Sequence, residues 1–241
     1  MKYIPVAKPS IDLTEEKNII ACVKSTWISS TGKYISDFES TFASLVGVKY
    51  AISCSNGTAA LHLALLSLNI GPGDEVIVPA LTFIATANVV KYVGATPVLV
   101  DVLPDTWTID PQLVEKRVSP KTRAIIPVHL YGYPSDMTPL QKIASRNNIA
   151  LIEDAAEAHE ATYKRKKVGS IGDLGCFSFF GNKIITTGEG GMISTNDSNI
   201  KNKIELLKNH GMSKTRKYFH PILGYNYRMT NLQAAIGTAQ L

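Results

Sequence analysis

The chain has 241 residues, of which 45% are hydrophobic and 19% charged. It can therefore bury a sizeable core, and disorder is disfavoured. The net charge of +5 is spread along the sequence, and the densest basic run, residues 164–167, contains no aromatic residue. A solvated turn is therefore favoured over a nucleic-acid-binding patch.

The cysteines and the apolar stretches indicate the compartment. The three cysteines, Cys22, Cys54 and Cys176, lie far apart, which gives no metal-ligand spacing and fits a reducing environment. The N-terminus lacks the apolar run of a signal peptide, and no stretch reaches the roughly 18 apolar residues of a membrane span. We expect a soluble cytoplasmic protein that binds neither nucleic acid nor a membrane.

Helical and strand-like spacing alternate along the chain. Thr14, followed by Glu15 and Glu16, is typical of a helix N-cap with an acidic first turn. Helices are predicted over residues 14–24, 34–46, 59–68, 82–93, 111–118, 138–147 (with Pro139 at its first helical position), 199–209 and from 231 onward. Strands are predicted over residues 50–53, 75–79, 97–101, 123–128, 149–154, 175–180 and 191–195, with a hairpin over 160–169. This alternation predicts an α/β fold, a mostly parallel sheet with helices on both faces.

Two features fall where such sheets bind ligands, at the carboxyl ends of their strands. Asp154 ends a buried strand, where an ionised carboxylate needs a partner. Gly57 and Thr58 join a strand to an almost wholly apolar helix, whose free N–H groups and positive dipole end could hold a phosphate. An ordinary capped core helix is the alternative interpretation of this turn.

Lys183 lies between a strand-like run and a glycine-rich segment, residues 186–192. The glycines let the backbone turn tightly and let a ligand come close. In a partly dry site its amine could lose a proton and condense with a carbonyl. A surface lysine beside a turn is the alternative.

Together, Lys183 and Asp154 meet the needs of pyridoxal phosphate. The aldehyde of this cofactor takes up a lysine, and its ring nitrogen keeps a proton beside a buried carboxylate. Further contacts to the phosphate and the ring could come from Gly57, Thr58, Ser178 and Phe83. A nicotinamide-dependent dehydrogenase is disfavoured, because no Gly-x-Gly-x-x-Gly follows an early strand.

Motifs along nearly the whole chain resemble the DegT/DnrJ/EryC1/StrS family of sugar aminotransferases. The resemblance is carried, in chain order, by Ser55-Asn-Gly-Thr58, Gly73-Asp-Glu-Val-Ile-Val-Pro79, Glu153-Asp-Ala-Ala-Glu-Ala-His159, Phe177-Ser-Phe179, Lys183, Thr186-Thr-Gly-Glu-Gly-Gly-Met192, His210-Gly-Met212 and Gly224-Tyr-Asn-Tyr-Arg-Met-Thr-Asn231. It implies the large domain of the aspartate-aminotransferase-like (type I) fold, with pyridoxal 5′-phosphate as cofactor.

The resemblance also implies a role for each site residue. Lys183 would form a Schiff base with the cofactor and then shuttle a proton. Asp154 would pair with the pyridinium nitrogen, and Glu157, at a position that is often Gln in relatives, would lie near the ring oxygen. Ser178 and the Gly57–Thr58 turn would bind the phosphate, with Phe83 stacked on the ring. Asn226 would reach the cofactor of a neighbouring subunit, so that a homodimer shares its active sites.

The resemblance further implies the substrates and the domain organisation. L-Glutamate would donate an amino group to a nucleotide-linked keto sugar, and residues 27–34 and 179–183 most resemble members that aminate C4 of a GDP-linked 4-keto-6-deoxy sugar for surface polysaccharides. Residues 1–230 would form the cofactor-binding large domain, and residues 231–241 would begin the helix leading to a smaller C-terminal domain that is absent. A truncated, non-catalytic relative that binds a cofactor or a partner is the alternative.

Overall fold

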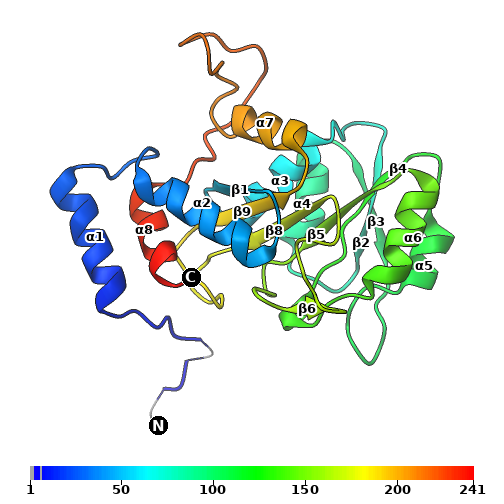
Figure 1. Ribbon diagram of the computed structural model, residues 1–241. Helices are drawn as coiled ribbons and strands as arrows, with labels where there is room; N and C mark the ends of the chain where they lie inside the picture. Colours follow the sequence, from blue (N-terminus) through cyan, green and yellow to red (C-terminus); the bar gives the residue numbers. More distant parts are fainter. Residues whose placement is uncertain (1–2, 6) are drawn as a thin grey trace.

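A seven-stranded sheet forms the centre of the computed structural model, which describes residues 3–5 and 7–241 (Figure 1). Its strand order is β1-β9-β8-β5-β4-β2-β3. The strands are β1 (Tyr50–Cys54), β2 (Glu75–Pro79), β3 (Thr96–Val100), β4 (Thr122–Ile125), β5 (Ala150–Asp154), β8 (Leu174–Ser178) and β9 (Gly191–Thr195). From β3 to β8 the strands run parallel, and β9 runs antiparallel to both neighbours. The expected α/β fold with a mostly parallel sheet is confirmed.

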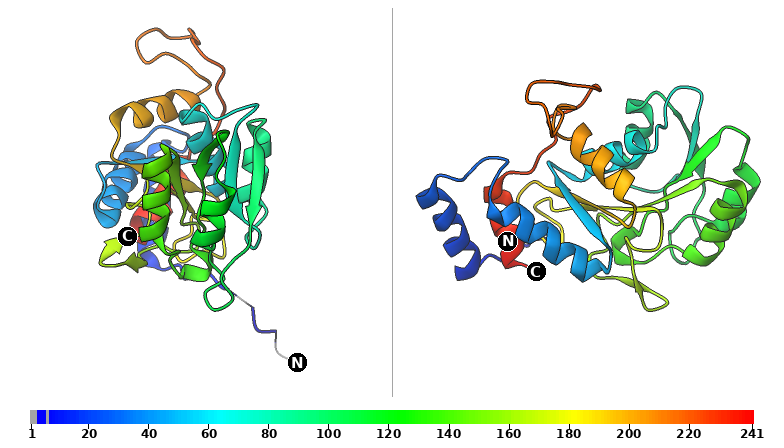
Figure 2. Two further views of the ribbon diagram at one scale, coloured as in Figure 1. Left: turned by 90° about the vertical axis from the view of Figure 1, so that its right-hand side faces the viewer. Right: turned by 45° about the horizontal axis from the view of Figure 1, so that its top comes forward.

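Helices cover both faces of this sheet (Figures 1 and 2). The helices are α1 (Leu13–Ser25), α2 (Lys33–Val46), α3 (Gly57–Ser67), α4 (Ala85–Tyr92), α5 (Pro111–Arg117), α6 (Met137–Asn147), α7 (Ser198–Leu207) and α8 (Asn231–Ala239). Of these, α1 packs on α8 and lies away from the sheet. Strand side chains alternate between the faces: Cys176 of β8 packs in the core under α3 and α7, and Phe177 packs on the opposite face against α2 and α8. A third buried cluster lies under α5 and α6 and includes Val114 and Leu140.

The N-terminus of α1 differs from the predicted one. Asp12 is the N-cap, because its Oδ1 accepts the N–H of Thr14 at 2.7 Å. Oε2 of Glu15 accepts the N–H of Asp12 at 3.0 Å, which completes a capping box. The assignment of Thr14 as the cap was therefore wrong, because an Asp two residues earlier can reach the same free N–H groups.

Two further helix starts also differ from the prediction. Helix α4 begins at Ala85, so residues 82–84 form a loop on the carboxyl side of β2. Helix α6 begins at Met137, which makes Pro139 its third residue and not its first. The predicted hairpin is confirmed: β6 (Thr162–Tyr163) and β7 (Lys166–Lys167) pair antiparallel around the basic turn.

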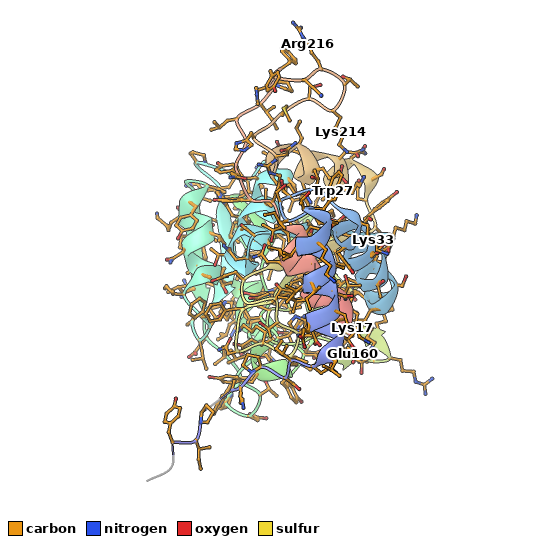
Figure 3. The ribbon with its side chains drawn as sticks, turned by 90° about the vertical axis from the view of Figure 1, so that its left-hand side faces the viewer. Lys17, Trp27, Lys33, Glu160, Lys214 and Arg216 are labelled. Atoms are coloured by element: carbon orange, nitrogen blue, oxygen red, sulfur yellow. The ribbon has the colours of Figure 1, made fainter. Side chains whose placement is uncertain are left out.

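One segment stands away from the body of the molecule. Residues 209–228, here called the projecting loop, extend beyond α7 (Figures 1 and 2). Lys214 and Arg216 lie on this loop, at the opposite end of the molecule from Glu160 (Figure 3). Over the described range, none of the helices is long and apolar enough to cross a membrane.

Candidate active site

A cleft of about 520 Å³ opens at the carboxyl ends of the parallel strands. Its walls come from the start of α3, the loop before α4, the end of β5 and the segment that follows β8. The cleft gathers the predicted site residues Gly57, Thr58, Phe83, Asp154, Glu157, Ser178 and Lys183. Residues separated by more than a hundred positions in the sequence thus meet at the edge where α/β sheets bind ligands.

Lys183 lies in this cleft on a turn after β8. Its N–H donates to the carbonyl of Phe180 at 3.0 Å, which fixes the turn. Its Nζ lies 3.1 Å from Oε1 of Glu157, and the two side chains are 17% and 26% exposed. The amine therefore faces a partly enclosed space and not open solvent.

Asp154 ends β5 with its carboxylate buried. Its Oδ2 accepts the hydroxyl of Thr86 at 2.8 Å, and its Oδ1 accepts the N–H of Ala156 at 3.2 Å. Burial raises the pKa of this carboxyl, and the hydrogen bond from Thr86 partly opposes the effect. A protonated nitrogen placed beside this carboxylate from the cleft would supply the missing positive charge.

The N-terminus of α3 forms the opposite wall. Asn56 caps the helix, since its side-chain oxygen accepts the N–H of Ala59 at 2.8 Å. Gly57 and Thr58 are the first two helical residues, whose N–H groups have no acceptor within a helix. A Cβ added to Gly57 would lie 2.7 Å from Cβ of Ser178, so only glycine lets the helix end approach that close. Free N–H groups, a hydroxyl and the helix dipole meet here, which suits an anion.

Replacing Gly57 with alanine should move Ser178 away from the N-terminus of α3. The new methyl group would push Ser178 away, and we expect about a tenfold loss of affinity for pyridoxal phosphate, in line with the 1–3 kcal/mol that overpacking typically costs. Equilibrium titration of the cofactor measures the effect. Gly181→Ala is the matched control, because a Cβ at Gly181 has no neighbour within 4 Å. Equal affinities for the two variants would contradict this account of the corner.

The two remaining predicted residues lie differently. Phe83 is 72% exposed at the rim of the cleft, on the loop before α4 and not inside a helix as expected. Asn226 lies on the projecting loop, where its Oδ1 accepts from Nη2 of Arg228 at 3.1 Å, and it does not line the cleft. A contact of Asn226 with a neighbouring subunit stays a prediction.

Several cleft residues had no part in the sequence-based site. Thr86 holds Asp154, and Tyr131 donates its N–H to Oε2 of Glu157 at 2.9 Å. An aromatic wall is formed by His62, Tyr92 and Tyr227. Thr86 lies one helical turn beyond Thr82, a spacing that could have drawn attention to it, whereas no local signal identifies a backbone donor such as that of Tyr131.

His159 ends the motif that begins at Glu153 and lies outside the predicted site. It is buried against the rings of Phe177 and Phe179, with ring centroids 5.7 and 5.6 Å away. Neither ring nitrogen has a hydrogen-bond partner within the described part of the chain. Burial, and then the charge of Lys183, lower the pKa of His159 to about 4. His159 is therefore a neutral packing residue.

Behind the cleft, Glu153 organises the reverse side of β5. Its carboxylate is fully buried and accepts from Nε2 of His129 at 3.0 Å and from the N–H groups of Gly169, Ile171 and Gly172 at 2.9, 2.7 and 2.7 Å. Nδ1 of His129 accepts the N–H of Ser135, which leaves Nε2 as the donor. The backbone N–H of His129 donates to the carbonyl of Asp154, so the network also fixes the strand end that carries the site.

Comparisons with known proteins identify the family of the chain. A model of the DegT/DnrJ/EryC1/StrS aminotransferase family matches residues 9–241. The chain belongs to this family. A protein of Caulobacter vibrioides named GDP-perosamine synthase is 58% identical over 238 residues, which are 99% of this chain and 64% of that protein.

Solved structures of related proteins share the fold. The aminotransferase from Psychrobacter cryohalolentis is 41% identical, with a TM-score of 0.93 over 98% of this chain and 62% of that one. The PLP-form of Spr1654 from Streptococcus pneumoniae is 32% identical, with a TM-score of 0.93 over 98% of this chain and 66% of that one. This chain therefore spans a little under two thirds of the length of such relatives.

Proposed function

We propose that the protein binds pyridoxal phosphate and transfers the amino group of L-glutamate to a nucleotide-linked 4-keto-6-deoxy sugar. The observation that carries the proposal is the meeting of Lys183, Asp154 and the Ser178–Gly57 corner in one cleft. The 58% identity to a GDP-perosamine synthase favours GDP-4-keto-6-deoxy-D-mannose as substrate and GDP-perosamine as product, for surface polysaccharide. We also propose a cytoplasmic location, where the three free cysteines would stay reduced.

The residues of the cleft fit this cofactor. A buried carboxylate whose hydrogen-bond donors are a hydroxyl and a backbone N–H suits a protonated ring nitrogen, and Asp154 supplies it. The N–H groups of Gly57 and Thr58, with the hydroxyl of Ser178, would hold the phosphate. Phe83 would cover one face of the ring from its exposed position on the rim.

When bound, pyridoxal phosphate supplies a carbonyl that accepts the amino group and a ring that draws electrons away from the reacting carbon. Lys183 would anchor the cofactor through Nζ and, once released, would carry a proton to and from the reacting carbon at the same Nζ. Asp154 would keep the ring nitrogen protonated, and Thr86 would hold the carboxylate in place. Glu157 would lie beside Lys183 and the ring oxygen.

Asp154→Asn should separate stability from function. The pKa of Asp154 is higher in the folded protein than in the unfolded protein. The contribution of this carboxyl to stability is therefore fully present at pH values below its unfolded pKa, and it is lost as the pH rises through its folded pKa. The cofactor-free asparagine variant should therefore melt at a higher temperature than the wild type at pH 7, and this gain should vanish near pH 4.

The transamination rate of Asp154→Asn should fall by about 10²–10³-fold, as when a preorganised electrostatic partner is removed. Melting curves and rates measured between pH 4 and pH 8 check both parts. If the melting temperature of Asp154→Asn relative to wild type were lower at pH 7 than at pH 4, Asp154 would not be a buried carboxylate that lacks compensation.

A homodimer with shared active sites belongs to the same proposal. Large apolar side chains around the cleft are exposed: Phe83 by 72%, Ile184 by 68%, Ile84 by 60% and Phe180 by 49%. Large apolar side chains that gather on a surface are typical of a protein contact. The projecting loop that carries Asn226 extends away from the body of the molecule, which suits an arm that reaches the cleft of a second subunit.

A panel of nucleotide-linked keto sugars tests the function. The protein is incubated with pyridoxal phosphate, L-glutamate and each sugar, and amino sugars are detected by mass spectrometry. We expect GDP-4-keto-6-deoxy-D-mannose to give the fastest turnover. Cofactor uptake without any amino sugar product would contradict the proposed reaction and favour a non-catalytic relative.

A further inference from the structure

The amine of Lys183 meets one carboxylate across the cleft. Oε1 of Glu157 lies 3.1 Å from Nζ, within the range of a charge-assisted hydrogen bond. Asp154, another carboxylate of the cleft, instead accepts hydrogen bonds from Thr86 and from the N–H of Ala156. The lysine is therefore paired with Glu157 and not with the residue assigned to the ring nitrogen.

Glu157 is itself held in place. Its Oε2 accepts the N–H of Tyr131 at 2.9 Å. Tyr131 adopts a left-handed backbone conformation, with φ of 50°, which an L-residue adopts only when its surroundings impose it. The carboxylate is thus fixed on one side by a constrained backbone donor and directs its other oxygen at Lys183.

A lysine must be neutral to attack a carbonyl. A carboxylate that accepts a hydrogen bond from the amine fixes the direction of the amine and must be displaced before the amine can attack. The pair therefore opposes attack for as long as it persists. A glutamine at the same position would keep a hydrogen-bond acceptor of similar shape and lose the charge. The carboxylate of Glu157 therefore has an effect on Lys183 that an amide would not have.

We infer that Glu157 is a positioning residue that holds the amine of Lys183 in an ion pair in the cofactor-free protein, and so slows cofactor capture. The inference rests on the proposed function for the identity of the cofactor. It adds a second role to the predicted place of Glu157 near the ring oxygen. The pair would be broken when Lys183 bonds to the cofactor.

Lysine reactivity tests the inference without any turnover. The cofactor-free wild type and Glu157→Gln are labelled at pH 7 with a limiting amine-reactive reagent, and each lysine is quantified by peptide mass spectrometry. Lys183 should label about threefold faster in the variant, as expected from the loss of a partly exposed ion pair. Capture of pyridoxal phosphate, followed by absorbance, should accelerate by a similar factor.

The chain offers a matched control. Lys201 pairs with Glu205 at 2.7 Å, with side-chain exposures of 29% and 22%, close to those of the Lys183–Glu157 pair. Glu205→Gln should speed the labelling of Lys201 and leave Lys183 unchanged, and circular dichroism checks that each variant is folded. Equal labelling of Lys183 in wild type and Glu157→Gln would overturn the inference. If Lys183 labelled faster in Glu157→Gln than in wild type but neither protein took up pyridoxal phosphate, the pairing of Glu157 with Lys183 would be supported and the proposed cofactor would be contradicted.

Discussion

Lys183→Ala is expected to reduce transamination by roughly 10³–10⁴-fold, because one side chain would both anchor the cofactor and move the proton. Its side chain, 17% exposed and beside Glu157, lines the cleft, and among the residues that the structure describes no other lysine does so. The loss should appear in kcat and not as a simple loss of substrate binding. Rates with L-glutamate and the keto sugar, measured at saturating pyridoxal phosphate, check the prediction.

Two controls separate chemistry from folding. Lys166→Ala removes an exposed lysine of the β6–β7 turn and should leave the rate unchanged. The melting temperature of Lys183→Ala should stay within a few degrees of wild type, since the lost ion pair is partly exposed. If a folded Lys183→Ala variant kept more than a tenth of the wild-type rate, Lys183 would not be the residue that anchors the cofactor and moves the proton.

Glu153→Gln is expected to lower the free energy of unfolding by about 3–5 kcal/mol, the range seen when one partner of a buried pair is removed. The carboxylate accepts hydrogen bonds from His129, Gly169, Ile171 and Gly172, all facing a side chain with no solvent contact. An amide has one acceptor oxygen, and its NH₂ group would point at N–H donors. Some of these buried donors would lose their partner. Urea unfolding of the cofactor-free protein measures the loss.

A surface ion pair provides the comparison. Glu115 pairs with Arg146 across α5 and α6, with side chains 51% and 63% exposed. Glu115→Gln should cost less than about 1 kcal/mol in the same experiment. Similar losses for the two variants would mean that the Glu153 network does not stabilise the strand end that carries Asp154.

Local patterns were sufficient for much of the site. Alternating strands and helices predicted the sheet, and the strand end at Asp154 and the small-residue turn at Gly57 predicted two walls of one cleft. The carboxyl ends of the strands of a parallel sheet lie at one edge, regardless of the conformation of the connecting loops. The position of Lys183 followed from the resemblance of its surroundings to the family.

Contacts that join distant parts of the chain could not be read in this way. The partners of Glu153 lie 16 to 19 residues further along the chain, on a loop whose path depends on the whole hairpin. The carboxylate of Glu157 meets Lys183 26 residues away, and its second oxygen meets a backbone group. Backbone donors leave no trace in residue identity, so such networks appear only when the fold is assembled.

The most direct test of the account is to trap the cofactor on the protein. The chain is incubated with pyridoxal phosphate, reduced with borohydride, digested, and searched by mass spectrometry for lysines that carry the reduced cofactor. The account predicts near-complete modification of Lys183, with little at the remaining lysines. A folded protein that carries no modification at Lys183, or that is modified equally at several surface lysines, would contradict the assignment of this cleft as a pyridoxal phosphate site.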